Sequence, residues 1–112
     1  MNFGEIYLVE IPVSGGHEQQ VVRPAIIVQI AGNIDKIPTI LIVPLTTKIK
    51  ASMFPFTFVV EPDSINNLTS TSVALIFQLR AIDKKRIKNR IGSLNADDIQ
   101  KLKQNLKNIL NV

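Results

Sequence analysis

The side chains that could carry chemistry in this 112-residue chain are few. There is no Cys, which excludes disulfides and thiolate metal sites, and the only His is His17, which excludes a multi-histidine metal site. A Ser-His-Asp triad would have to use His17, and nothing obvious in its glycine-rich loop would orient that ring. The chain also lacks phosphate-binding Gly motifs and a repeated Asp-x-Asp pattern. Any catalysis must therefore rest on positive charge, hydroxyl groups and one or two acids.

That inventory suits phosphate chemistry. RNA carries its own nucleophile, the 2′-OH, beside the scissile phosphate, so a protein need only align this hydroxyl, stabilise the phosphoryl oxygens and move protons. An Arg fork holds two phosphoryl oxygens, and a Thr hydroxyl can donate to a third. Arg is almost always protonated and is therefore an unnatural base. Glu18 or His17 could supply the base if the fold brings either one close.

Positive charge is concentrated in one segment. The chain has 13 Lys and Arg against 9 Asp and Glu, a net charge of +4. Within residues 80–90 the only acid is Asp83, and the cations there are Arg80, Lys84, Lys85, Arg86, Lys88 and Arg90. Such a patch attracts polyanions. Two interpretations stay open: a solvated strand or turn with protective cations, or a surface that meets an acidic protein or a nucleic acid.

The elements that must position these groups are mostly strands. Short runs rich in β-branched and aromatic residues are separated by polar or Gly/Pro-rich loops, which predicts a mainly β fold, a small antiparallel barrel. The predicted strands are 6–9, 25–28, 40–43, 56–60 and 73–77. Pro44 lacks an N–H donor, so we expect the hydrogen-bonded ladder to break there and the Thr side chains after it to be re-aimed.

The last eighteen residues change to a helical period. Asn95 is the expected N-cap, with Asp98 three residues later, and apolar residues recur at helical spacing from Ile99 to Leu110. The length predicts one domain over residues 1–112. No apolar run approaches the roughly 20 residues that span a bilayer, so the cytoplasm is the expected location.

Several motifs occur in a specific order. Glu18-Gln19 lies in the first loop, Arg23-Pro24 precedes the second apolar run, Val43-Pro44-Leu45-Thr46-Thr47 ends the third, and Gln78-Leu79-Arg80 follows the fifth. In order and spacing this chain resembles the MazF/PemK (Kid-like) toxins of type II toxin–antitoxin systems. The resemblance extends from residue 4 to the C-terminal helix.

The resemblance implies a homodimeric SH3-like barrel of the MazF/CcdB type. It implies a sequence-specific endoribonuclease (mRNA interferase) that cleaves single-stranded RNA through the 2′-OH, without metal or other cofactor, and leaves a cyclic phosphate or 3′-phosphate and a 5′-OH. Arg23 and Thr46 match the family's catalytic pair. A neutralising antitoxin with an acidic tail is implied as partner. The positions implied to contact RNA are Glu18, Gln19, Gln78, Arg80 and, beside the first pair, His17.

Two positions depart from the family pattern. Relatives commonly have a small Ser where this chain has His17, and many have an acid where it has Phe77. The cleavage motif of relatives therefore does not transfer. We expect His17 to be an exposed loop residue. Phe77 could stack on a base, but an aromatic residue on a strand is more often part of the core.

Other interpretations stay open. A CcdB-like DNA gyrase poison shares the fold, but that relative uses a Trp-containing C-terminal tail, and this chain has no Trp. A barrel that only binds RNA or a protein is also compatible with the residues. Arg23 could merely pair with Glu5 or Glu18, and Thr46 could merely cap its own backbone.

Overall fold

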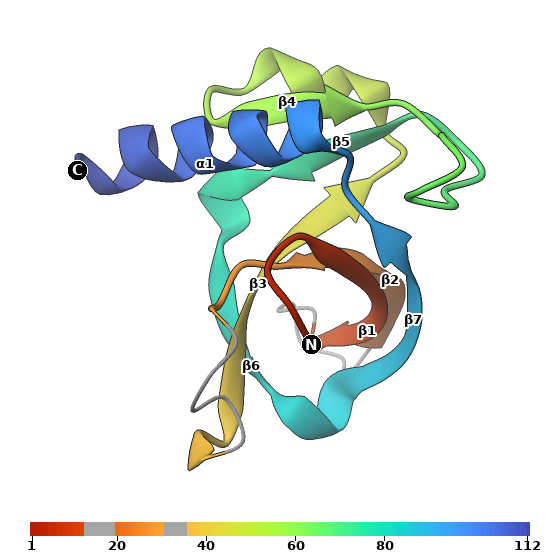
Figure 1. Cartoon of the computed structure of the whole chain (residues 1–112), viewed down its shortest axis with the longest axis vertical. Coiled ribbons are helices and arrows are strands. Elements are labelled where there is room, and N and C mark those ends of the chain that lie inside the picture. Colours follow the sequence, from red (N-terminus) through yellow and green to blue (C-terminus); the bar gives the residue numbers. More distant parts are fainter. Residues whose placement is uncertain (13–19, 31–35) are drawn as a thin grey trace.

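The computed structural model describes residues 1–12, 20–30 and 36–112, and Figure 1 shows a curled β-sheet with one α-helix lying across it. The prediction of a mainly β fold with a C-terminal helix is confirmed. The strands are β1 (Glu5–Pro12), β2 (Gln20–Ile27), β3 (Thr39–Thr46), β4 (Thr57–Val60), β5 (Ser72–Leu75), β6 (Arg80–Asp83) and β7 (Ile87–Ser93). The helix is α1 (Ala96–Leu110), and short 3₁₀ turns occur at η2 (Ile49–Met53), η3 (Ile76–Gln78) and η4 (Lys84–Arg86).

The strands pair antiparallel in the order β4-β5-β3-β2-β1-β7, and β6 pairs with β3 beside this path. A closed barrel would need a ladder between β6 and β7, and the described part of the chain has none. The sheet is therefore not closed by hydrogen bonds at this point. The chain makes that join instead: β6 runs into β7 through η4. The Asp83 carboxylate caps this turn by accepting the Lys85 N–H at 2.9 Å.

Pro44 marks a change of partner along β3. The ladder with β6 ends at Ile42 and the ladder with β2 ends at Pro44, whereas pairing with β5 begins at Leu45. This agrees with the expected break, because Pro44 has no N–H to donate. The last residues of β3 therefore separate from β2 and leave room between the two strands.

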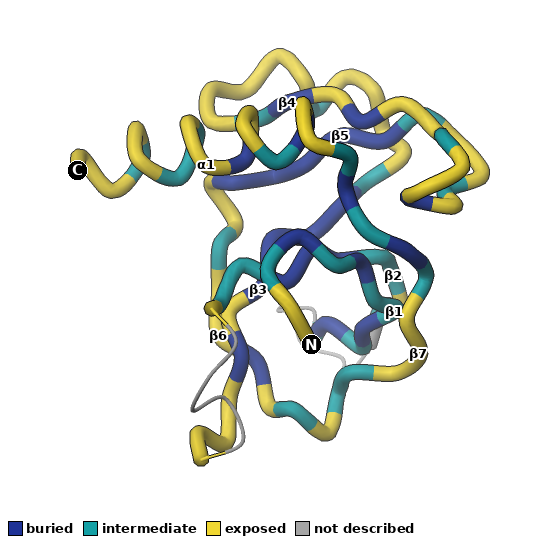
Figure 2. Tube along the Cα trace, viewed as in Figure 1, coloured by how far each residue is buried: buried dark blue, intermediate teal, exposed yellow. Residues whose placement is uncertain are grey.

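Successive side chains of β2 and β3 belong alternately to two apolar cores. Ile26 and Val43 belong to the first, which packs beneath α1 with Leu102, whereas Ala25 and Ile42 belong to the second. Figure 2 shows the buried residues concentrated on these central strands, with exposed residues at the C-terminal end of the helix and at the connections. Because successive side chains of a strand point to opposite faces, both faces of the central strands are buried.

The start of α1 agrees with the sequence. Asn95 is the N-cap, and its Oδ1 accepts the Asp98 N–H at 2.8 Å. Gly4 packs against the first turn of this helix, where a side chain would collide with Ile99, and its φ of +88° is a further reason for glycine. No helix within the described ranges is long and apolar enough to span a membrane.

Two predictions about residues 73–90 need correction. The run 73–77 does not continue as a strand: β5 ends at Leu75, and η3 carries Phe77 and Gln78. Phe77 is 39% exposed, so the expectation that it belongs to the core is wrong. The cationic segment lies outside the predicted strands, yet it holds β6, η4 and most of β7. Only Ile82 of β6 is buried, which explains why the apolar signal is weak there.

Candidate functional site

A cleft of ≈ 300 Å³ opens where β2 and β3 separate. Its walls come from the beginning of β2, from the end of β3 and the residues after it, and from the first residue of β5. The lining residues are Val21, Val22, Arg23, Pro24, Leu45, Thr46, Thr47, Lys48 and Ser72. Arg23 and Thr46 therefore lie in one cleft, although 22 residues separate them in the sequence.

The strand register explains why these two residues meet. Ala25 pairs with Pro44, and Ile27 pairs with Ile42. Continuing this antiparallel register by two residues brings Arg23 opposite Thr46, beyond the last ladder pair. Both side chains follow the face of β2 and β3 that carries Ala25 and Ile42 in the second core. The cleft is the polar continuation of that apolar face.

Arg23 is half-buried, and its backbone pairs with Val9 of β1. Its side chain forms no hydrogen bond or ion pair with any other residue that the structure describes. Glu5 is engaged elsewhere: its Oε2 lies 2.6 Å from Nε of Arg90. Burial acts to raise the pKa of Glu5, but hydrogen bonds from the Asn2 N–H and Arg90 outweigh it and hold that pKa below its usual range. Pairing of Arg23 with Glu5 is therefore wrong, and Glu18 lies outside the described residues.

Thr46 lies at the end of β3, and its hydroxyl group makes only one of the hydrogen bonds that it can form with the described residues. Its Oγ1 accepts the Lys48 N–H at 3.2 Å, which is the backbone-capping role considered from the sequence. A hydroxyl has two acceptor lone pairs and one proton, so this bond leaves the Thr46 O–H able to donate into the cleft. The two roles are compatible, because the cap fixes a hydroxyl at the wall of the cleft that Arg23 also lines.

Comparison with known proteins assigns the family. Residues 2–110 match the family described as the PemK-like, MazF-like toxin of type II toxin–antitoxin system. The chain belongs to this family. Three solved structures illustrate the shared fold: MazF from Deinococcus radiodurans at 22% identity and TM-score 0.79, an endoribonuclease in complex with its cognate antitoxin from a mycobacterial species at 17% and 0.78, and the Mycobacterium tuberculosis toxin MazF-mt6 at 18% and 0.76.

The likeness to these structures covers whole chains. The match to MazF from Deinococcus radiodurans covers 100% of this chain and 97% of the other. The match to the mycobacterial endoribonuclease covers 100% and 96%, and the match to MazF-mt6 covers 96% and 97%. The first two matches therefore include the region around the cleft and both ends of the chain.

The structure describes only some of the other residues that the family resemblance implies to contact RNA. Arg80 is exposed on β6 and pairs in register with Ile42, so its side chain shares the face of Thr46, and its Nη1 donates to the Pro12 carbonyl at 3.5 Å. Gln78 lies in η3 rather than on the fifth strand. His17, Glu18 and Gln19 lie outside the described residues.

The cleft includes two polar residues that the sequence analysis missed. Lys48 lines its mouth two residues after Thr46, a spacing that a search for cations near the hydroxyl would have found. Ser72 is buried in the wall, and its hydroxyl donates to the Ser70 carbonyl at 3.1 Å. No signal in the sequence brings Ser72 to this cleft, because it arrives through the pairing of β5 with β3.

The cationic segment of residues 80–90 has two different halves. On β7, Lys88 lies 2.5 Å from Glu10, and Arg90 lies beside Glu5, so both cations face acids of β1. That half fits the interpretation of a solvated strand. The β6 and η4 half carries Arg80, which donates to the neutral Pro12 carbonyl, followed by Lys84, Lys85 and Arg86 of η4.

Proposed function

We propose that this family member acts as a sequence-specific endoribonuclease on single-stranded RNA, as the toxin of its toxin–antitoxin pair. The observation that carries the proposal is the meeting of Arg23 and Thr46 in one cleft, with Lys48 at its mouth. The cleft thus holds a permanent cation, a hydroxyl donor and a second cation around one small volume. These groups can stabilise the negative charge that develops on the phosphoryl oxygens in the transition state. A mycobacterial relative of the same fold is itself described as an endoribonuclease.

In the proposed reaction the 2′-oxygen of the substrate attacks the adjacent phosphorus. The new bond from the 2′-oxygen to phosphorus forms as the bond from phosphorus to the 5′-oxygen breaks. Arg23 holds two non-bridging oxygens through its fork, and the Thr46 O–H donates to the developing negative charge. The products are a 2′,3′-cyclic phosphate and a 5′-OH, and hydrolysis of the former gives a 3′-phosphate.

Two protons must move in this reaction. One leaves the 2′-OH for a base, and one reaches the departing 5′-oxygen. Arg23 suits charge stabilisation far better than proton abstraction, because a guanidinium group is effectively always protonated in proteins. Glu18 and His17 stay the candidates for the base. RNA supplies the nucleophile itself, so the proposed chemistry assigns no role to a metal.

We propose that single-stranded RNA extends from the cleft over Arg80 and Gln78. Bases of a single strand can be splayed out and read along their edges, a task suited to amide side chains such as those of Gln78 and Gln19. Phe77 stands where many relatives have an acid, so we expect a cleavage motif that differs from theirs. The proposed place of action is the cytoplasm, where the messenger RNA lies.

The exposed aromatic rings support a homodimer. Phe54, 59% exposed, follows η2, and its ring centroid lies 5.4 Å from that of Phe77. Exposed apolar clusters of this kind mark interaction surfaces. We propose that a second copy packs on them, and that Phe54→Lys yields a monomer in sedimentation equilibrium. An unchanged dimer mass would contradict this interface.

We also propose an antitoxin with an acidic segment as the partner. The +4 charge and the cations of β6 and η4 favour an acidic chain, and solved relatives include a toxin in complex with its cognate antitoxin. Exposed charge pairs are screened within about 10 Å at 0.1 M salt, so the affinity should fall as salt rises. A salt-independent affinity would instead point to an apolar interface.

The decisive test incubates the purified protein with a long single-stranded RNA in excess EDTA and maps the fragment ends. Discrete cuts at a recurring motif, with 5′-OH ends, are the expected result. Arg23→Ala serves as the contamination control, and Arg23→Lys keeps the charge but removes the two-pronged fork. Intact RNA from a folded wild-type protein would contradict the proposal, and a gyrase–DNA cleavage assay would then test the CcdB-like alternative.

A further inference from the structure

A second cavity, of ≈ 450 Å³, lies at the opposite end of β3 from the Arg23–Thr46 cleft. We name it the lysine cavity; its lining residues are Lys36, Ile37, Pro38, Asp83, Lys84 and Lys85. Two contacts bring these segments together: Thr39 pairs with Asp83, and the Lys84 N–H donates to the Pro38 carbonyl at 3.2 Å. The cavity is therefore part of the β3–β6 pairing.

The lysine cavity is cationic. Three of its six lining residues are lysines, of which Lys36 and Lys85 are exposed. Its one acid, Asp83, is already used by the fold, because its carboxylate accepts the Lys85 N–H at 2.9 Å. Lysine ammonium groups are point charges that bind phosphate without needing a fixed orientation. Such a cavity suits an anion held by charge rather than by shape.

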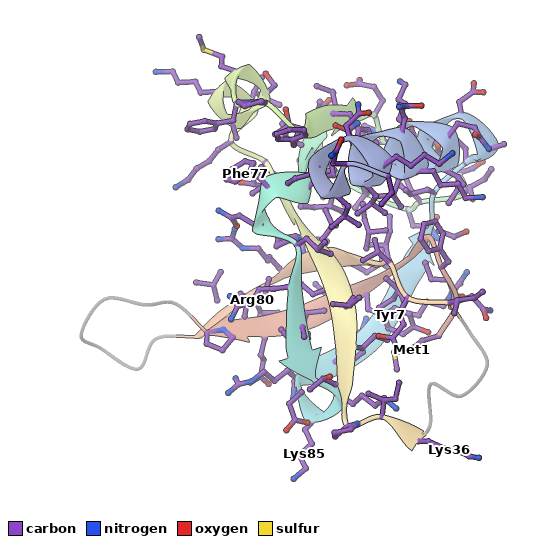
Figure 3. All side chains as sticks on the ribbon, turned by 90° about the vertical axis from the view of Figure 1, so that its left-hand side faces the viewer. Met1, Tyr7, Lys36, Phe77, Arg80 and Lys85 are labelled. Atoms are coloured by element: carbon purple, nitrogen blue, oxygen red, sulfur yellow. The ribbon has the colours of Figure 1, made fainter. Side chains whose placement is uncertain are left out.

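Arg80 links this cavity to the cleft. β6 runs beside β3 from Arg80, opposite Ile42, to Asp83, opposite Thr39. Figure 3 shows Phe77, Arg80 and Lys85 following one another along the molecule, with Lys36 and Lys85 both at the lower end. β3 spans seven residue steps from Thr39 to Thr46, about 23 Å at 3.3 Å per residue. Positive side chains thus stand at both ends of the strand and between them.

We propose that the lysine cavity binds backbone phosphates of the same RNA strand whose scissile phosphate occupies the Arg23–Thr46 cleft. The inference rests on the proposed function and extends its RNA footprint to a second site. About seven stacked nucleotides, at about 3.4 Å each, cover the length of β3, and an extended strand needs fewer. Cations spaced along one strand match a repeating phosphate backbone, which favours RNA over an acidic peptide as the occupant.

The test compares two RNAs of different length that contain the same cleavage motif. One is about six nucleotides long with the scissile phosphate at its centre, so only about three nucleotides, roughly 10 Å when stacked, extend toward the lysine cavity and fall short of it. The other is about twenty nucleotides long with the same centre, enough to pass the whole length of β3. A 2′-deoxy nucleotide at the scissile position blocks cleavage, so that Kd can be measured by fluorescence anisotropy. The variant is the double substitution Lys36→Gln/Lys85→Gln, which keeps long polar side chains but removes two charges.

We expect the variant to bind the long RNA several-fold more weakly and the short RNA as tightly as wild type does. Removal of one phosphate-binding cation on a single strand makes the slope of log K against log salt shallower by about 0.7, so the slope for the long RNA should become shallower by about 1.4. The control variant Lys103→Gln/Lys107→Gln removes the same charge from α1 and should weaken neither RNA selectively.

Three results would overturn the inference. Equal weakening of both RNAs would show that the two lysines act only through the overall field of the protein. An effect no larger than that of the α1 control would show that the cavity contacts no RNA. Unchanged RNA binding with abolished binding of a ten-residue polyglutamate peptide would assign the cavity to an acidic protein segment. Cleavage of all-ribose RNA by wild type, mapped first, tests the proposed function and supplies the motif. Absence of cleavage would overturn the proposed function, whereas the three binding results above would overturn only the role of the lysine cavity.

Discussion

Two polar regions of this molecule differ in what their hydrogen-bonding groups are used for. In the first, the Asp63 corner formed by Asp63, Asn66 and Asn95, the side chains satisfy one another and the nearby backbone. In the second, the Arg23–Thr46 cleft, the groups keep capacity that the described residues do not use. A polar cluster that is satisfied internally holds the fold together, whereas one with capacity left over is suited to bind a ligand.

The contacts of the Asp63 corner are short and numerous. Asp63 accepts the N–H groups of Ile65 and Asn66 at 2.8 and 2.7 Å, and it accepts the side-chain amide of Asn95 at 2.9 Å. The side chain of Asn66, which is 0% exposed, bonds three backbone groups of its own loop. Because Asn95 also caps α1, this corner attaches the loop before β5 to the start of the helix.

The largest expected effect is in the cleft. Arg23→Ala should lower kcat/KM for RNA cleavage by about 10³-fold, because it removes the cation that stabilises the phosphoryl oxygens. The free energy of unfolding should change by less than about 0.5 kcal/mol, since no described residue bonds the Arg23 side chain and its backbone pairing with Val9 is kept. Cleavage kinetics and urea unfolding measure the two quantities. Full activity in a folded Arg23→Ala protein would remove this residue from the proposed mechanism.

Thr46→Val should reduce cleavage by about 10²-fold, because it removes one donor to the developing charge while it keeps the β-branched shape. Thr46→Ser is the matched control and should retain most of the activity, because its hydroxyl can still accept the Lys48 N–H. Single-turnover rates on one defined RNA would check both variants. Equal losses in the Ser and Val variants would assign Thr46 a packing role instead.

The Asp63 corner should respond in the opposite way. Asn66→Ala should cost about 2 kcal/mol of stability, because it removes the three hydrogen bonds of a fully buried side chain. The cleavage rate per folded molecule should not change. Asn89→Ala, on the exposed part of β7, is the control and should stay within about 0.5 kcal/mol of wild type. Loss of cleavage in folded Asn66→Ala would show that the two regions are coupled.

The smallest expected effect is a pH dependence at Asp63. Its hydrogen bond from the Asn66 N–H holds the pKa of this carboxyl below its usual range; burial opposes this, and bonds from Asn95 and Ile65 add to it. A pKa lowered by folding stabilises the protein above the unfolded-state pKa, and that stability is lost as the pH falls. The stability difference between wild type and Asp63→Asn should therefore shrink from about pH 5 to about pH 2.

Urea unfolding at several pH values would measure that difference. Burial raises the pKa of Asp98, so its contribution has the opposite sign and weakens as the pH rises. The burial of Asp98 is common to both proteins, but the Asp63 charge also helps to raise the Asp98 pKa and is lost in Asp63→Asn. Repeating the comparison in an Asp98→Asn background removes this contribution. A difference that stays constant from neutral to acidic pH would show that Asp63 stabilises the corner without its charge.

Local chemistry was the easiest part to predict from the sequence. The Asn95 cap and the extent of α1 follow from a few neighbouring residues, and the loss of pairing at Pro44 follows from one missing N–H. The end of β5 was harder, because the apolar run continues through Ile76 and Phe77 while the backbone has already turned into η3. Apolar pattern alone does not distinguish a strand from a tight turn that buries Ile76 and exposes Phe77.

Taken alone, the sequence determined the class of chemistry, the order of the motifs and thus the family, together with the local signals that begin and end the helix. Only the tertiary structure decided which charges meet. Glu5 binds Arg90, 85 residues later in the chain, and so does not neutralise Arg23. The pairings of β2, β3 and β5 bring Arg23, Thr46 and Ser72 to one cleft. These are long-range strand registers, set by the packing of both faces of the sheet at once, and no local stretch of residues contains that information.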